Sequence, residues 1–273
     1  MMRGKIGQWA LACLGGLAAW LAGLNLAGAA ESLPEKDLAK IREALPDKAT
    51  AEPAKPRKLL LFGRCEGFRH TDGILAGNAA FRMMGEKTKA FSTEESTEMS
   101  AFDPENLNRF DAVVFNNTTT LKFESPVHRK ALLDFVHGGK GMVGVHSSTD
   151  NFYNWPEGAA LMGALFWGHP WGQCAVKLDD ASHPLVKVFG GEGFYVQDEM
   201  YRMKEPYSRE KLRVLLSMDL SHMSQKDADV GRPDKDNPIA WIQQAGKGRV
   251  FYCALGHDRK VFFLKPVLQF YLD

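Results

Sequence analysis

Residues 111–146 read DAVVFNNTTTLKFESPVHRKALLDFVHGGKGMVGVH and contain a complete strand–helix–strand unit. Asp111–Phe115 is a short apolar run of the kind that forms a buried strand. Ser125-Pro126 then supplies a preferred N-cap and first helical residue, an apolar stripe follows at helical spacing, and Gly138 is a typical C-cap. A second apolar run, Met142–Val145, comes after the glycines. Two strands joined by one helix form a parallel pair with a right-handed crossover, so this stretch predicts an α/β fold.

The same alternation extends on both sides of this unit. Upstream, Lys58–Gly63 predicts a strand, a helix starts at about Asp72 with Thr71 or Asp72 as its cap, and a weaker strand lies near Lys89–Phe91. Downstream of Trp171, irregular stretches instead of long helices join the expected strands, and a last helix begins at Pro266. We therefore expect the sheet to continue with some antiparallel members. The downstream strands are Cys174–Leu178, Glu199–Met203, Leu212–Met218, Ile239–Gln243 and Arg249–Leu255.

The first 57 residues do not have the composition of a folded domain. Residues 1–30 have a positive start at Arg3 and Lys5, an apolar run and a small-residue exit at Ala27–Ala29, as in a signal peptide. An uncleaved anchor is the weaker interpretation because the apolar run, Trp9–Leu24, is short for a membrane span. Residues 31–57 contain an amphipathic stripe followed by several prolines, and we interpret them as a linker. We expect an exported protein, periplasmic or extracellular, with one domain over residues 58–273.

Charge and cysteine content exclude several classes of protein. The chain has 34 Lys and Arg residues against 33 Asp and Glu residues, and the predicted signal peptide accounts for two of the positive ones. This balance gives no electrostatic basis for binding nucleic acid, or a membrane beyond the signal peptide. Cys65, Cys174 and Cys253 remain after the predicted cleavage, which argues against a disulfide framework and against a Cys-rich zinc site. A single disulfide between two of them stays possible at this point.

Histidines recur where predicted strands end or begin. His70 follows the first strand, His146 ends the 142–145 strand, His257 follows the last strand, and His169 lies in a loop rich in aromatic residues. A single histidine at a strand end is more often structural. However, the carboxyl ends of parallel strands share one edge of a sheet, and ligands bind there in open α/β folds. We therefore expect these four histidines to converge on one cleft, with Asn117 and Glu199 nearby.

The sequence Gly144–Ser148, GVHSS, resembles the turn that presents a nucleophile in α/β hydrolases. The nucleophile position holds His146, and Ser147 beside it would point away from the cleft. Acyl transfer through a serine or a cysteine is therefore disfavoured. Nucleotide dependence is disfavoured too, because no GxGxxG or P-loop sequence follows the first strand.

Eight segments in the body of the chain carry a family pattern, in nearly complete coverage and in the right order: GFRH (67–70), NNT (116–118), GKGMVGVHSSTDNFY (139–153), GHPW (168–171), HPL (183–185), DEMYR (198–202), NPIAW (237–241) and GKGRVFYCALGH (246–257). With these segments the chain resembles the trehalose-utilisation (ThuA-like) family. The resemblance implies a fold related to class I glutamine amidotransferases: a flavodoxin-like, mostly parallel sheet with helices on both faces and irregular C-terminal extensions. It also implies a role in carbohydrate metabolism, without an agreed reaction. The amidotransferase cysteine is missing, so glutamine amidotransferase activity is not expected.

We expect an enzyme, a hydrolase, lyase or isomerase, that acts on a sugar or keto-sugar by proton transfer. His146 would be the general acid or base, with His70, His169 and His257 as partners and Glu199 as the orienting carboxylate. The partner would be a small-molecule carbohydrate, and aromatic faces and polar groups would hold it. The predicted binding residues are Asn117, Asp150, Tyr153, Trp155, Trp171, Asp198 and Arg249.

Alternatives to this expectation remain. No cofactor is expected, but zinc held by His146, His169 and a carboxylate is possible, although no HExxH spacing supports it. A non-catalytic carbohydrate-binding module would use the same aromatic cleft. An accessory protein of a sugar oxidoreductase system is the third alternative.

Overall fold

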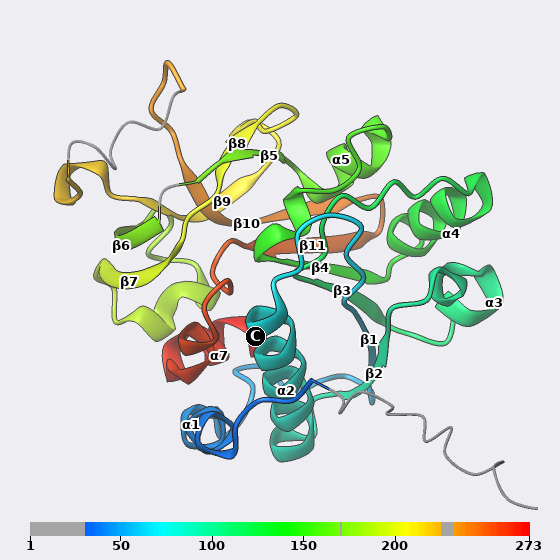
Figure 1. Ribbon diagram of the computed structural model, residues 1–273, viewed down its shortest axis with the longest axis horizontal. Helices are drawn as coiled ribbons and strands as arrows, with labels where there is room; N and C mark the ends of the chain where they lie inside the picture. Colours follow the sequence, from blue (N-terminus) through cyan, green and yellow to red (C-terminus); the bar gives the residue numbers. More distant parts are fainter. Residues whose placement is uncertain (1–30, 170, 225–231) are drawn as a thin grey trace, which may run out of the picture. The chain divides into compact units, whose positions relative to one another are not determined.

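The computed structural model describes residues 31–169, 171–224 and 232–273, so the predicted signal peptide lies outside the described residues. Nine strands form one sheet in the order β2-β1-β3-β4-β11-β10-β9-β6-β7 (Figure 1). The first five pair in parallel, and their order matches that of a flavodoxin-like sheet. These five are β2 (Ser92–Ser96), β1 (Lys58–Phe62), β3 (Ala112–Asn116), β4 (Gly141–Val145) and β11 (Gly248–Cys253).

The other strands pair antiparallel and complete the sheet, as the downstream sequence predicts. They are β10 (Pro238–Ala245), β9 (Arg213–Met218), β6 (Trp171–Leu178) and β7 (Phe194–Glu199). A separate two-stranded sheet joins β5 (Leu165–Gly168) to β8 (Arg202–Lys204). The α/β fold with a parallel core and antiparallel extensions is therefore confirmed.

Two strand predictions are wrong in detail. The strand expected at Glu199–Met203 is broken, because β7 ends at Glu199 and the chain turns before β8 begins at Arg202. The strand expected at Lys89–Phe91 begins instead at Ser92, because the preceding helix runs to Thr88 and Lys89 ends it in the left-handed conformation, with φ of 59°.

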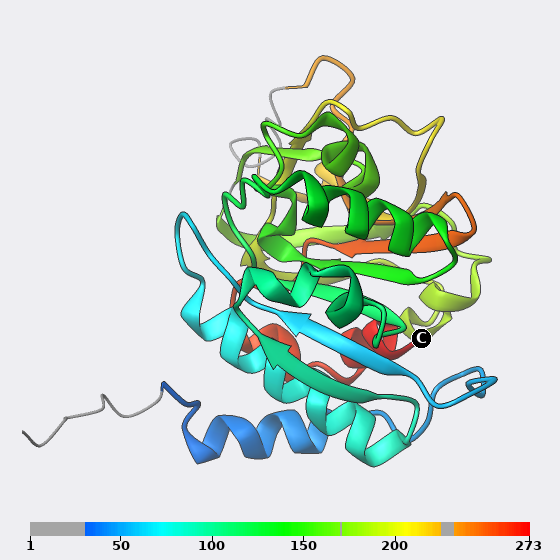
Figure 2. The same cartoon turned by 90° about the vertical axis from the view of Figure 1, so that its right-hand side faces the viewer.

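Helices cover both faces of the sheet (Figures 1 and 2). One group contains α1 (Glu35–Ala44), α2 (Thr71–Thr88) and α7 (Lys265–Leu272), and the other contains α3 (Pro104–Leu107), α4 (Pro126–His137) and α5 (Pro156–Met162). The predicted caps of α4 are confirmed, since the Ser125 side chain accepts a hydrogen bond from the His128 amide and Gly138 is the C-cap. For α2 the cap prediction is wrong: His70 is the N-cap and Thr71 is already helical. Short 3₁₀ segments lie at Met99–Phe102, His146–Thr149, Pro184–Phe189, Leu220–His222 and Arg259–Phe263.

The prediction that residues 31–57 form a linker is wrong for the first half of the segment. Leu33, Ile41 and Leu45 are buried in the main hydrophobic core, and α1 contacts α2. The Lys87 ammonium also donates a hydrogen bond to the Leu45 carbonyl. The helical stripe therefore docks on the domain, and only the later part, from about residue 47, is largely exposed. Among the described residues no helix combines the length and the apolar character needed to cross a bilayer.

One edge of the sheet gathers loops from distant parts of the chain. The loops after β1, β3, β4 and β11 leave from the carboxyl ends of neighbouring parallel strands. β6 pairs with β9 only through Val176–Leu178, whereas it pairs with β7 from Trp171 to Val176. The Glu199 end of β7 thus extends beyond the β9 edge and reaches the loop after β11, where Asp198 accepts backbone hydrogen bonds.

Candidate active site

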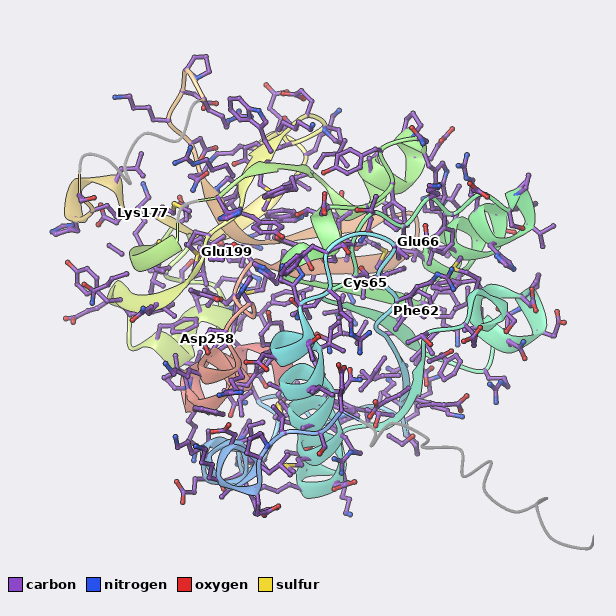
Figure 3. The ribbon with its side chains drawn as sticks, in the orientation of Figure 1. Phe62, Cys65, Glu66, Lys177, Glu199 and Asp258 are labelled. Carbon is purple, nitrogen blue, oxygen red and sulfur yellow. The ribbon has the colours of Figure 1, made fainter. Side chains whose placement is uncertain are left out.

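Four imidazoles converge on the carboxylate of Glu199, and these five side chains are the Glu199 cluster. His257 Nδ1 lies 3.0 Å and His146 Nε2 3.3 Å from Glu199 Oε2, with His70 Nε2 at 3.8 Å. His169 Nδ1 lies 3.0 Å from the other oxygen, Oε1. Glu199 lies beside the loop that leads into α2 (Figure 3). The predicted convergence of the four histidines on one edge of the sheet is therefore confirmed.

The backbone that presents these side chains is strained at two neighbouring strand ends. His146 directly follows β4 and has φ of 48°, and Asn117 directly follows β3 with φ of 54°. Residues other than glycine rarely adopt this left-handed conformation, and when they do they often lie at functional sites. The sequence resemblance of Gly144–Ser148 to a nucleophile-presenting turn thus corresponds to a real backbone feature, with His146 at its apex.

Close approach between α2 and the loop after β11 brings two histidines together. A Cβ atom on Gly73 would lie 2.5 Å from the Gly256 carbonyl oxygen, so a larger residue would push the helix and the loop apart. With glycine at position 73, the rings of His70 and His257 lie 4.8 Å apart at an interplanar angle of 89°. The glycine therefore sets the width of the site.

Asp198 fixes the end of β7 in this site. The Gly256, His257 and Asp258 amides donate hydrogen bonds to its carboxylate, at 2.7, 3.3 and 2.9 Å. Asp198 is fully buried, and burial raises its pKa to about 7 against the effect of these amides. Its oxygens are occupied by backbone, so the prediction that Asp198 binds substrate is wrong; it anchors Glu199 next to it.

Within the cluster, the buried His146 is neutral and the Glu199 carboxylate is ionised. His146 is fully buried, and desolvation lowers its pKa to about 4, so the ring is neutral near pH 7. Although burial alone would raise the pKa of Glu199, the neighbouring imidazoles of His146, His257 and His70 hold it well below its usual range. Burial lowers the pKa of His257, but the hydrogen bond and the charge of Glu199 outweigh burial, so the pKa of this imidazole is raised.

The tautomer of His146 follows from its other ring nitrogen. His146 Nδ1 lies 2.8 Å from the Ala254 carbonyl oxygen, which only accepts, so Nδ1 carries the proton. Nε2 of the neutral ring therefore directs a lone pair toward Glu199. This buried Nε2 atom has no hydrogen-bond partner among the described residues, and neither has His70 Nδ1.

A pocket of about 410 Å³ opens beside the cluster, with His70 and His257 in its wall. Its volume is within the range of small-molecule sites. Phe68, which the sequence analysis missed, also lines the pocket; it is 69% exposed and its ring lies 4.8 Å from that of His70. The remaining lining residues are polar or charged: Arg69, Thr71, Asp72, Asp258, Arg259 and Lys260.

Two predicted binding residues lie elsewhere. Trp155 is 2% exposed and stacks on Phe123 at 5.4 Å in the core, so its predicted role in stacking on a sugar is wrong. Arg249 pairs in register with Gly141, at the start of two parallel strands. It therefore lies at the end of the sheet opposite the cluster, and its predicted binding role is also wrong.

Other predicted residues lie around the cluster with different surroundings. Tyr153 is 41% exposed, and its hydroxyl donates to Asp150 at 2.5 Å. Burial, only partly offset by that hydrogen bond, raises the pKa of Asp150. Asn117 is buried, and its amide donates to Asn116 and to the Gly256 carbonyl, which makes it a support of the β11 loop. The side chain of Trp171 lies outside what the structure describes.

The possible metal ligands differ from the predicted pair. One ligand atom from each of His70, His146, Glu199 and His257 lies within 4.8 Å of the other three, a spacing that could hold a metal ion. His169 is not in this group, although it contacts the far oxygen of Glu199. Of the predicted ligands, His146 and a carboxylate belong to this group. The predicted ligand His169 does not, and His70 and His257 take its place. The three described cysteines, Cys65, Cys174 and Cys253, are free thiols.

Sequence reasoning missed two aromatic residues here, Phe68 and Tyr201, whose ring lies 4.3 Å from that of His146. The signal was present, because Phe68 precedes His70 in GFRH and Tyr201 follows Glu199 in DEMYR. Both are adjacent to residues that the sequence did single out.

Comparison with known proteins identifies relatives of the chain. Residues 58–272 match the ThuA family model, described as trehalose utilisation. A solved ThuA-like protein from Bacteroides uniformis is 23% identical with a TM-score of 0.64, over 80% of this chain and 91% of that one. A second, from Parabacteroides merdae, is 18% identical with a TM-score of 0.58, over 78% and 89%. A cytoplasmic protein from Salmonella typhimurium has a TM-score of 0.51 at 12% identity, over 79% and 96%. No curated protein sequence matches the chain.

Proposed function

The chain belongs to the ThuA family, and on that premise we propose that it is an enzyme acting on a sugar or keto-sugar by proton transfer at the Glu199 cluster. One observation carries the proposal: four imidazoles from four separate loops surround one carboxylate, and two of them, His70 and His257, line a ligand-sized pocket. Concentrating five titratable groups in this way costs desolvation and backbone strain, which a purely structural role would not require.

Accessibility distinguishes the roles within the cluster. The His169 side chain is 40% exposed, so a substrate hydroxyl or a carbon acid can reach its ring directly. His146 is fully buried, which argues that it positions Glu199 instead of meeting the substrate. We therefore assign general acid–base catalysis to His169, in contact with Glu199 Oε1. An imidazole suits this role because its ordinary pKa lies near neutrality.

The pocket has the composition of a sugar site. Phe68 offers an exposed aromatic face on which the apolar side of a pyranose ring can stack. Arg69, Asp72 and Lys260 line the same pocket and supply hydrogen-bonding groups for hydroxyls. A keto-sugar would gain most from the arrangement, because abstracting the proton beside a carbonyl needs a base and a nearby group that stabilises the developing negative charge.

A non-catalytic carbohydrate-binding module is the second candidate. The exposed aromatic side chains Phe68, Tyr153 and Trp167 favour it, since binding alone requires aromatic faces and no acid–base group. Catalysis is the better proposal because the module leaves the Glu199 cluster unexplained.

Incubation of the purified protein with a panel of disaccharides and their 3-keto forms, followed by product analysis, separates the two. Turnover of one substrate class supports the enzyme. Saturable binding without any product supports the module. The absence of both turnover and binding across the whole panel would contradict both candidate functions.

A further inference from the structure

His146 and Glu199 face each other at close range in the cluster. Because His146 Nδ1 donates to the Ala254 carbonyl, the other ring nitrogen, Nε2, faces Glu199 Oε2, only 3.3 Å away. Nε2 is buried and has no hydrogen-bond partner among the described residues. A buried ring nitrogen without a partner beside a carboxylate oxygen is placed as a metal-binding histidine would be.

The other two histidines complete a set of donors around the same oxygen. His257 Nδ1 and His70 Nε2 lie 3.0 and 3.8 Å from Glu199 Oε2. Ligands of a tetrahedral zinc ion lie ~3.3 Å apart, given Zn–N bonds of ~2.0–2.1 Å. The distances to Glu199 are near this value, and the four ligand atoms all lie within 4.8 Å of one another.

The orientation of the rings also fits ligation of one ion. The planes of the His70, His146 and His257 rings meet at 79°, 89° and 90°, with centroids 4.8 to 5.2 Å apart. Three imidazoles that direct one nitrogen each at a common point, from three sides, produce this mutual tilt. The Nδ1 contact of His146 with a backbone carbonyl is the outer-shell bond typical of a metal-bound histidine.

We propose that His70, His146, His257 and Glu199 bind one divalent first-row transition-metal ion. Imidazole ligands suit zinc, copper, iron and nickel, whereas magnesium and calcium require oxygen ligands. The site goes beyond the proposed function, and the catalytic role of the ion rests on that function: a bound ion would polarise a sugar carbonyl or hydroxyl as a Lewis acid. His169, which contacts Glu199 Oε1, remains outside the ligand set and keeps its assigned role in proton transfer.

Titration of the metal-free full chain with Zn²⁺ and Co²⁺ tests the proposal independently of activity. The protein is stripped with a chelator, dialysed and titrated by calorimetry, and the cobalt form is followed by its visible spectrum. We expect one equivalent of ion to bind. Glu199→Gln and His257→Asn, each checked for native folding by circular dichroism, should abolish stoichiometric binding, because each removes a ligand.

Two histidine variants serve as matched controls. His169→Ala removes a partner of Glu199 without removing a ligand, so affinity should fall by no more than the ~10–100-fold typical of outer-shell changes. His222→Ala removes an exposed histidine paired with Asp219 and should leave binding unchanged. Zinc-edge X-ray absorption of the wild-type protein needs no variant and should show nitrogen and oxygen ligands with no sulfur.

Absence of stoichiometric binding to the wild-type protein would overturn the proposal. So would wild-type affinity in both ligand variants, or sulfur in the zinc coordination sphere. The proposed function is tested separately: turnover that survives complete removal of metal supports the enzyme and refutes a catalytic role of the ion, while the titration still decides whether the site binds it. An ion bound with all expected ligands, but without turnover of any sugar, supports the site and refutes the enzyme.

Discussion

Replacing Asp198 with alanine should destabilise the domain, because Asp198 ties β7 to the loop after β11. The substitution leaves the amides of Gly256, His257 and Asp258 without their acceptor. A buried hydrogen-bonding group that loses its partner costs ~1–3 kcal/mol. Since water entering the space will accept hydrogen bonds from some of these amides, we expect the free energy of unfolding to fall by ~3 kcal/mol rather than by the sum of three such costs. For a domain of this size that corresponds to a fall in melting temperature of ~6–12 °C.

Thermal unfolding followed by circular dichroism measures this effect. Asp198→Asn keeps one carbonyl oxygen as an acceptor and should lose less stability than the alanine variant. Asp134→Ala is the matched control, because that aspartate is exposed on α4 and its ion pair is with Lys130 on the same helix surface, so its loss should cost ~0.5 kcal/mol or less. A melting temperature for Asp198→Ala within the range of the Asp134→Ala control would refute the anchoring role.

Three further predictions concern other parts of the chain. Phe68→Ala should weaken sugar binding by up to ~10-fold without changing the melting temperature, because the ring is 69% exposed at the pocket; unchanged affinity in calorimetry would contradict its role in stacking. Although burial opposes it, hydrogen bonds from Arg209 and Tyr207 lower the pKa of Asp236, so the folded state favours the ionised form. That stability is present above the ordinary pKa of ~4 and is lost as the pH falls below it, so between pH 5 and 3 the wild-type protein should lose more stability in thermal unfolding than Asp236→Asn does; equal losses would contradict the assignment. We also propose that the protein is exported, so N-terminal sequencing of secreted material should begin near Ala30 or Glu31, and a chain that begins at its first methionine in the membrane fraction would indicate an anchor.

Local signals account for the parts of the fold that the sequence predicted well. The α4 segment has a capping serine, a proline at its first position and a glycine at its end, and all three act within a few residues of themselves. The convergence of His70, His146 and His257 followed from topology, because parallel strands place their carboxyl ends together. No knowledge of side-chain packing was needed for either inference.

Non-local contacts account for most of the errors. Trp155 is in an aromatic segment whose sequence fits a binding surface as well as a core. Its stacking on Phe123, a contact that the sequence does not show, places it in the core. The anchoring of Asp198 by the amide of Gly256 joins residues 58 positions apart, which no local pattern records. Arg249 is different: it begins its predicted strand, so the sequence alone placed it at the edge opposite the histidines, and that error was avoidable.

Turnover by Glu199→Gln tests the central claim most directly, because all four histidines contact the Glu199 carboxylate. The assay uses the substrate that the sugar panel identifies, with wild-type protein and His222→Ala as references. Glutamine keeps the shape of the side chain and removes its charge. We predict that kcat/KM falls by at least ~10²–10⁴-fold, the usual contribution of a positioned acid–base group, while circular dichroism shows a native fold. A natively folded Glu199→Gln protein with wild-type turnover would contradict the assignment of this cluster as the active site.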